Sequence, residues 1–159
     1  MLLPKSFWAM CKIVAVSACL LGVRCRYDGK CCYNKAVIEY LSDKLIIPVC
    51  PEIYGGLETP REACEISNND SITKVISIKG ADVSDSYITG AEEALKKVKR
   101  FKADEAILKS LSPSCGLGMI YDGSFTKRII AADGIFVRLL KRENIPVKTE
   151  KHCEKELTD

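Results

Sequence analysis

Short apolar runs rich in β-branched residues alternate along this chain with segments whose apolar residues recur every three or four positions. The runs predict strands covered on both faces, and the periodic segments predict amphipathic helices. Strands are expected at residues 12–17, 45–49, 73–78, 106–109 and 145–147, and helices at residues 34–45, 84–98 and 133–140. This alternation predicts an α/β fold, with one mostly parallel sheet and helices on both of its faces.

The length of the chain, 159 residues, suits a single domain with one core. We expect an N-terminal arm over residues 1–11, an α/β domain over residues 12–150 and a charged C-terminal tail over residues 151–159. The first ten residues lack the basic start and the cleavage site of a signal peptide, and no apolar run approaches the roughly 20 residues that cross a bilayer. We therefore expect a cytoplasmic protein without a membrane partner.

The formal net charge of the chain is +3, and its basic residues are spread out. The densest basic cluster, at residues 96–100, is explained by the solvated face of a helix. We therefore expect no nucleic-acid partner, and the pattern does not predict an oligomeric state.

Nine cysteines stand out in the composition, and an odd number of thiols does not pair off completely. Without a secretory signal, the thiols indicate metal binding, redox chemistry or plain burial rather than a disulfide framework. Cys19, Cys50 and Cys115 share one context, because each follows a predicted buried strand and has a glycine soon after it. The carboxyl ends of parallel strands meet at one edge of a sheet, so these three sulfurs are expected to converge there.

Three converging thiolates could hold a tetrahedral zinc ion with a solvent position, or an iron–sulfur cubane in which one iron lacks a protein ligand. The single histidine, His152, lies close to the C-terminus, and the chain has no Cys-x-x-Cys pair. A third interpretation is that the three thiols are unrelated core residues. Spacing alone leaves the three interpretations open.

Several short motifs along the chain are characteristic when they occur together. They are Ser-Ala-Cys-Leu-Leu-Gly at residues 17–22, Cys-Arg-Tyr-Asp-Gly at 25–29, Cys-Pro-Glu at 50–52 with Gly-Gly-Leu at 55–57, Pro-Arg at 60–61, Ser-Pro-Ser-Cys-Gly at 112–116 and Tyr-Asp-Gly-Ser-Phe at 121–125. Together they resemble the TudS-like thiouracil desulfidase family, also known as the domain-of-unknown-function family DUF523. The likeness runs from about residue 12 to residue 150.

The resemblance implies a single Rossmann-like, three-layer domain that carries a [4Fe–4S] cluster on three cysteines. By position, these ligands map to Cys19, Cys50 and Cys115. The resemblance also implies removal of sulfur from a thiolated pyrimidine without net redox change. Some relatives carry an additional helical domain and act on thiolated tRNA uridine, but this chain has no room for it. A small free base such as 2-thiouracil is therefore the expected substrate.

In the expected mechanism the thione sulfur binds the open iron, a Lewis acid, and water attacks the carbon, which yields sulfide and the oxo-base. Glu52, two residues after Cys50, is the candidate base that activates the water, although it could instead cap the following turn. Ser112 and Ser114 could orient the substrate or relay a proton, or could merely shape their turn.

Three charged residues are candidates for substrate binding. Asp28 and Asp122 stand in two similar Tyr-Asp-Gly turns and could bind pyrimidine N–H groups or only close those turns. Arg61 could hold a carbonyl oxygen of the base, or pair with a neighbouring glutamate at the surface.

Two alternatives to desulfuration belong to other functional classes. One is a non-enzymatic iron–sulfur protein that senses oxygen or passes electrons, and the other is a zinc–thiolate binding module. Four further thiols have no assigned role: Cys25 could be a spare thiol at the rim of the site, Cys31 and Cys32 open a predicted helix, and Cys64 is unassigned.

Overall fold

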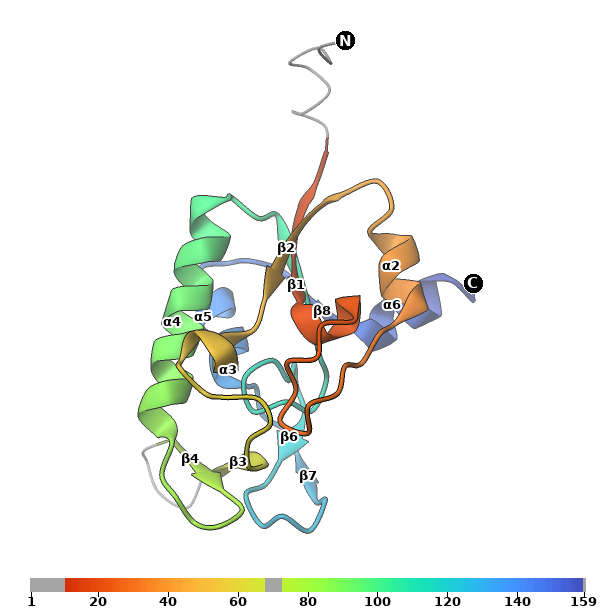
Figure 1. The fold of residues 1–159 in the computed structure, drawn as a ribbon. Helices are drawn as coiled ribbons and strands as arrows, with labels where there is room; N and C mark the ends of the chain where they lie inside the picture. Colours follow the sequence, from red (N-terminus) through yellow and green to blue (C-terminus); the bar gives the residue numbers. More distant parts are fainter. Residues whose placement is uncertain (1–10, 68–72, 159) are drawn as a thin grey trace.

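The structure is a computed structural model and describes residues 11–67 and 73–158. Its centre is a four-stranded sheet in the order β2-β1-β5-β8 (Figure 1). The strands are β1 (Ile13–Ser17), β2 (Leu45–Val49), β5 (Glu105–Leu108) and β8 (Val147–Thr149). All three pairings between neighbouring strands are parallel, so the predicted parallel sheet is confirmed.

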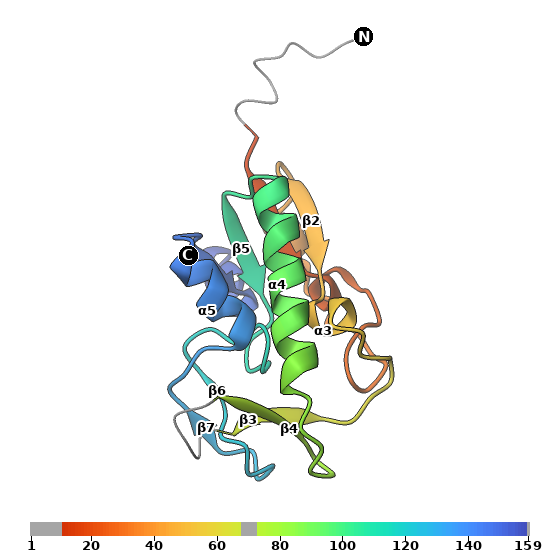
Figure 2. The same cartoon turned by 90° about the vertical axis from the view of Figure 1, so that its left-hand side faces the viewer.

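Helices cover both faces of this sheet (Figures 1 and 2). The helices α4 (Ser84–Arg100) and α5 (Ile135–Arg142) lie on one face, and α2 (Lys35–Tyr40) and α6 (Glu150–Glu156) lie on the other. Alternate residues of β1 point to opposite faces, so Ala15 belongs to the core under α4, and Val14 and Val16 to the core under α2. All three are fully buried, which explains the unbroken apolar run and confirms the three-layer fold.

The longest helix, α4, packs against α3 (Pro51–Tyr54), the single turn that follows β2. Two glycines allow this approach: a Cβ atom on Gly90 would lie 1.9 Å from the carbonyl oxygen of Pro51, and one on Gly55 would lie 2.0 Å from that of Ser86. Because Gly90 faces α3, the buried face of α4 includes Tyr87, and Ile88 is exposed. Close contact between these helices fixes the chain directly after Cys50.

Two small antiparallel pairs lie beyond the carboxyl ends of the main strands (Figure 1). In one, β3 (Cys64–Ser67) pairs with β4 (Lys74–Ser77), and in the other, β6 (Ile120–Tyr121) pairs with β7 (Ile129–Ile130). The Glu65 side chain joins them, because its Oε2 accepts hydrogen bonds from the backbone N–H groups of Gly123 (2.9 Å) and Phe125 (3.0 Å). The two pairs thus form a second wall facing the sheet edge.

The structure describes the C-terminal end of the chain up to residue 158, but the N-terminal end only from residue 11. Residues 1–10 of the expected N-terminal arm lie outside the described residues. The sequence pattern suggests a charged tail after residue 150, whereas the structure has α6 there, with Cys153 buried on its inner side. His152 takes part in a capping box, since its Nδ1 accepts a hydrogen bond of 3.0 Å from the backbone N–H of Thr149. Among the described residues, no helix has the length and apolar character needed to cross a membrane.

Candidate functional site

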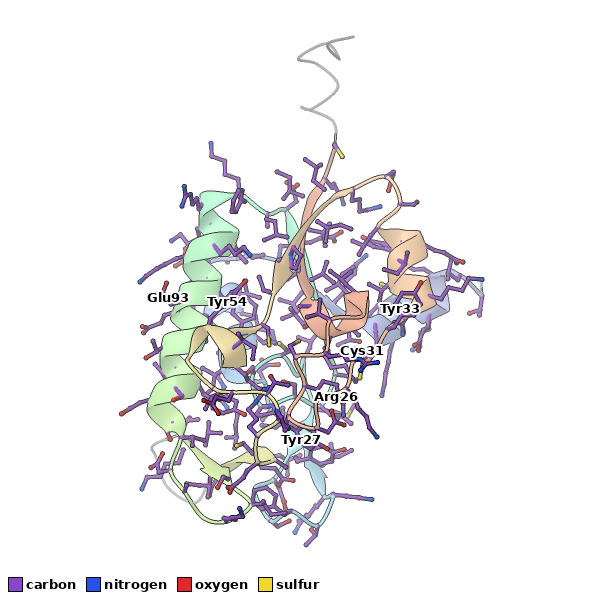
Figure 3. All side chains as sticks on the ribbon, in the orientation of Figure 1. Arg26, Tyr27, Cys31, Tyr33, Tyr54 and Glu93 are labelled. Carbon is purple, nitrogen blue, oxygen red and sulfur yellow. The ribbon has the colours of Figure 1, made fainter. Side chains whose placement is uncertain are left out.

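A cavity of about 410 Å³ opens at the carboxyl ends of β1, β2 and β5. The loops that follow these strands form one side of it, and the two antiparallel pairs contribute the other. Figure 3 shows Arg26 and Tyr27 on the loop between η1 (Ala18–Leu21) and α2, and both residues lie on the cavity wall. Ligands of parallel α/β sheets bind at this edge, so the cavity is the candidate site.

The structure brings the three predicted cysteines to this one cavity. Cys19 lies in η1, directly after β1, and Cys50 is the residue before the first turn of α3, directly after β2. Cys115 lies in the loop after β5. Cys19 and Cys115 are buried and Cys50 is half-buried. Three cysteines that are remote in the sequence therefore line one cavity at the strand ends.

The turn that presents Cys115 is shaped by Ser112. The Ser112 Oγ accepts hydrogen bonds of 3.1 Å from the backbone N–H groups of both Ser114 and Cys115. Gly116 closes the turn by donating its N–H to the Ser112 carbonyl at 2.8 Å. Burial raises the pKa of the Cys115 thiol to about 12, although Ser17 and Ser112 lower it in part. Ser112 thus holds a thiol in place at the cavity wall.

A fourth cysteine, Cys25, joins the predicted three, and Cys64 also reaches the wall. The Cys25 thiol is buried in the same cluster of packed side chains as Cys19, and Cys50 packs against that cluster. The contact with Cys19 raises the pKa of Cys25 to about 11, with burial adding to the rise and Cys50 opposing it. The contact with Cys25 and burial both raise the pKa of Cys50.

Glu52 and Arg61 form an ion pair at the cavity wall. The Arg61 Nε donates to Glu52 Oε2 at 2.8 Å, and Nη2 donates to the same oxygen. Only 9% of the Arg61 side chain and 13% of the Glu52 side chain are exposed. Burial opposes the charge on Arg61, but the neighbouring carboxylate outweighs it and raises the pKa of Arg61. The pair is therefore held in a single geometry.

The other N–H groups of Arg61 also have partners. Its Nη1 donates to the carbonyl oxygen of Glu58 at 3.0 Å and to Thr59 Oγ1 at 3.2 Å, and its Nη2 donates to the carbonyl oxygen of Cys25 at 3.0 Å. A guanidinium has five N–H donors, so this set leaves none free for a ligand. In the structure, Arg61 therefore binds groups of the protein itself and has no N–H donor left for a substrate carbonyl.

Ser114 lies next to the free oxygen of Glu52. Its Oγ is 3.5 Å from Glu52 Oε1, and the residue is buried at the cavity wall. Since Arg61 occupies Oε2, the second oxygen is the one that can meet a proton donor in the cavity. A carboxylate and a hydroxyl on one wall can act together in proton transfer.

Neither Asp28 nor Asp122 is on the cavity wall. Asp28 accepts hydrogen bonds from Arg26 at 3.2 Å and from the backbone N–H of Lys30 at 3.0 Å. Asp122 accepts from the backbone N–H of Ser124 at 3.0 Å. Both carboxylates thus close their own turns, and the residues before them, Tyr27 and Tyr121, line the cavity instead.

A buried polar group beside the cavity was not predicted from the sequence. Lys109 and Ser110 follow β5 on the cavity wall, and the carboxylate of Glu150 behind them binds both. The Lys109 Nζ donates to Glu150 Oε1 at 2.6 Å, and the Ser110 N–H donates to Oε2 at 2.9 Å. Glu150 directly follows β8. Because ligands of parallel sheets bind at the carboxyl ends of the strands, its position in the sequence could have indicated that it lies near the site.

Tyr87 and Phe125 are two further wall residues absent from the sequence prediction. Tyr87 comes from the first turns of α4 and is almost fully buried. Burial raises the pKa of this phenol far above its usual range. Phe125 has a left-handed backbone with φ of 58°, held by the hydrogen bond from its N–H to Glu65. No sequence signal marks Tyr87, whereas Phe125 ends the Tyr-Asp-Gly-Ser-Phe motif, in which it had no assigned role.

Within residues 11–67 and 73–158, no three His, Cys, Asp or Glu side chains are grouped as ligands of one metal ion. Cys19, Cys50 and Cys115 instead share the lining of the cavity of about 410 Å³. Thiolates are the ligands of iron–sulfur clusters, so the donor set and the space suit a polynuclear cluster.

Comparisons with known proteins agree with this geometry. A model of the family described as 2-thiouracil desulfurase matches residues 14–152. The uncharacterized protein YbbK of Bacillus subtilis (strain 168) is 35% identical over 144 residues, which cover 87% of this chain and 95% of that protein. The solved structure of a [4Fe-4S]-dependent thiouracil desulfidase, TudS (DUF523Vcz), has a TM-score of 0.80 and 34% identity, covering 91% of this chain and 94% of its own.

The buried carboxylate of Glu150 predicts how the stability of the fold depends on pH. Burial raises the pKa of Glu150, but the hydrogen bonds from Lys109 and Ser110 outweigh it, so the net shift is downward from 4.5. A depressed carboxyl pKa stabilises the fold above the unfolded value, and this contribution is lost as the pH falls through the folded pKa. Glu150→Gln should therefore lower the free energy of unfolding by about 1–3 kcal/mol at neutral pH, and by progressively less below pH 4.5.

Urea unfolding of the wild type and the variant over this pH range measures the difference. The matched control is Glu93→Gln, since Glu93 pairs only with Lys96 on the exposed side of α4, and it should change little at any pH. A gap between wild type and Glu150→Gln that stays constant through pH 4.5 would show that folding does not lower the pKa of Glu150.

Proposed function

The chain belongs to the 2-thiouracil desulfurase family, and on that premise we propose that it removes the sulfur of a small thiolated pyrimidine, such as 2-thiouracil, as sulfide. The observation that carries the proposal is the meeting of Cys19, Cys50 and Cys115 at one cavity, beside a buried carboxylate. In this proposal the three thiolates hold a [4Fe–4S] cluster, the group named for the similar solved structure.

The donor set fits such a cluster. Three cysteine sulfurs ligate three irons of a cubane, and the fourth iron then has no ligand among these three residues. Once bound, the cluster supplies a soft Lewis acid at that iron, suited to a thione sulfur. The nine cysteines are all free thiols, and ligation requires them reduced, so we place the protein in the cytoplasm.

Glu52 is the proposed base. Its Oε2 is occupied by Arg61, so Oε1 is left to accept a proton from water that attacks the pyrimidine carbon. Arg61 is a positioning residue in this scheme, because all its donors bind protein groups and fix the carboxylate. A base held in one orientation needs no reorganisation when the proton moves.

Ser114 is the proposed proton relay between Glu52 and the sulfur that leaves the substrate. Its Oγ is 3.5 Å from Oε1, a distance that a small movement closes to a full hydrogen bond. Ser112 contributes through the backbone, because it fixes the turn that presents Cys115. The two serines therefore have different roles, one in proton transfer and one in holding a ligand.

The aromatic residues of the wall suit a flat substrate. Tyr27 lies in the loop between η1 and α2, Tyr121 in β6 and Phe125 in the connection between β6 and β7, and all three line the cavity. Aromatic faces stack on planar bases without selecting one base by hydrogen bonds. Asp28 and Asp122 act in this proposal by holding the turns that carry the two tyrosines, rather than by touching the base.

Replacement of each ligand tests the cluster assignment. After anaerobic reconstitution with iron and sulfide, Cys19→Ala, Cys50→Ala and Cys115→Ala should each lose the brown chromophore and most of the bound iron, because two sulfurs do not retain the cluster. The measurements are visible absorbance and the iron, zinc and acid-labile sulfide content per chain.

Cys153→Ala is the matched control, since Cys153 is also a buried thiol but lies in α6 and is not on the cavity wall. It should keep the full cluster. A chromophore that survives Cys115→Ala, or stoichiometric zinc in place of iron in the wild type, would refute the assignment. A wild-type cluster without turnover of any thiolated base would favour the sensor alternative.

Replacement of Glu52 tests the catalytic step. Glu52→Gln should keep the cluster and release sulfide from 2-thiouracil about 10²- to 10⁴-fold more slowly, the usual contribution of a general base. Sulfide release and the loss of thione absorbance measure the rate. The control is Glu62→Gln, because Glu62 is in the same loop as Arg61 but pairs with Lys79 at the surface. Unchanged turnover in Glu52→Gln would remove Glu52 from the mechanism.

A further inference from the structure

The N–H groups of a pyrimidine have no assigned partner on the cavity wall. Asp28 and Asp122, the residues expected to bind them, close their own turns instead and do not line the cavity. Among the described residues that line the cavity, two carry a carboxylate, and these are Glu52 and Glu65. Glu52 is the proposed base, so Glu65 is the carboxylate on the wall that the proposed reaction does not use.

Glu65 lies in β3 and has one of its two carboxylate oxygens occupied. Its Oε2 accepts the hydrogen bonds from the N–H groups of Gly123 (2.9 Å) and Phe125 (3.0 Å). Within residues 11–67 and 73–158, no hydrogen bond or ion pair involves Oε1. No buried side-chain oxygen or nitrogen of these residues lacks a partner, so Oε1 is accessible rather than enclosed by protein. Because Glu65 lines the cavity, this oxygen can meet a donor of a ligand there.

The carboxylate of Glu65 is held next to a stacking residue. A Cβ atom on Gly123 would lie 2.9 Å from the carbonyl oxygen of Ile66, so the loop between β6 and β7 approaches β3 closely. Phe125 belongs to this loop, and the hydrogen bond from its N–H to Glu65 fixes its backbone while its side chain lines the cavity. A base that stacks on an aromatic ring presents its N–H groups at the edge of its own plane. One local unit thus supplies both a stacking surface and an acceptor.

We propose that Glu65 binds the substrate, with Oε1 accepting a hydrogen bond from a ring N–H group of the thiolated pyrimidine. This inference rests on the proposed function, because it adds a contact in the same cavity. In 2-thiouracil the carbon that carries the sulfur is bonded to two N–H groups, so an acceptor for either one orients the C–S bond. An ionised carboxylate only accepts hydrogen bonds and therefore selects a ring nitrogen that carries a proton. Glu65 supplies the selection among bases that stacking does not.

Glu65→Gln tests this contact and leaves the hydrogen bonds of the loop in place. An amide nitrogen accepts no hydrogen bond, so the Gln oxygen takes the position of Oε2, and the amide nitrogen faces the ligand as a donor. The KM for 2-thiouracil should rise about 10- to 100-fold, the usual effect of losing a hydrogen bond to a charged group. The kcat should change little, because the contact is made before and during the reaction alike.

Calorimetric titration with uracil, the expected product, measures the same contact without turnover. The wild type should bind uracil more tightly than 1,3-dimethyluracil, which has no N–H group, and Glu65→Gln should lose most of this preference. The matched control is Glu62→Gln, because Glu62 lies in the loop before β3 and pairs with Lys79 at the surface. It should keep both the KM and the preference of the wild type.

An unchanged KM, or an unchanged preference for uracil, in a folded Glu65→Gln would overturn the role of Glu65. If this variant does not fold, crystals of the wild type with bound uracil decide the question. A ring nitrogen should then lie within about 3.2 Å of Glu65 Oε1, and ring nitrogens bonded only to other groups would overturn the contact. A wild type that releases no sulfide from any thiolated base would refute the proposed function, and this inference with it. Failure of the Glu65 tests in a wild type that does release sulfide would overturn this inference alone.

Discussion

The parallel pairing of β1 with both β2 and β5 is the constraint on which the site depends. Ser17 is in register with Val49, and Val16 with Ile107, so the three strands end at one level of the sheet. Cys19 and Cys50 follow those ends within two residues, and the turn shaped by Ser112 brings Cys115 back to the same edge. Backbone hydrogen bonds of the sheet thus bring together sulfurs that are up to 96 positions apart in the sequence.

Arg61 joins the catalytic and the ligand-bearing parts of the cavity. It binds the carboxylate of Glu52, the carbonyl oxygen of Cys25 and, through its backbone, the loop at Tyr27. A buried ion pair contributes little net stability, because desolvation of both charges offsets their attraction. Its value here is geometric, since one guanidinium fixes the carboxylate of Glu52 and the backbone of the loop that carries Cys25.

The sequence was sufficient for the sheet and for the gathering of the cysteines, because both follow from local patterns and from one rule of parallel sheets. The rest depends on tertiary contacts. The buried face of α4 follows from the approach of Gly90 to Pro51, which has no local signature, so Tyr87 was missed. Glu150 was assigned to the end of the domain because a charged residue is expected to be exposed. In the structure, the ion pair with Lys109 lets its carboxylate be buried.

The central claim is that Cys19, Cys50 and Cys115 hold one iron–sulfur cluster in the cavity at the strand ends. Anomalous diffraction at the iron absorption edge, from crystals of the anaerobically prepared protein, tests it most directly. The account predicts iron scattering inside this cavity, bonded to those three sulfurs, with one iron free of protein side chains. Iron bonded to a different set of cysteines, or a single zinc ion at the three sulfurs, would contradict it.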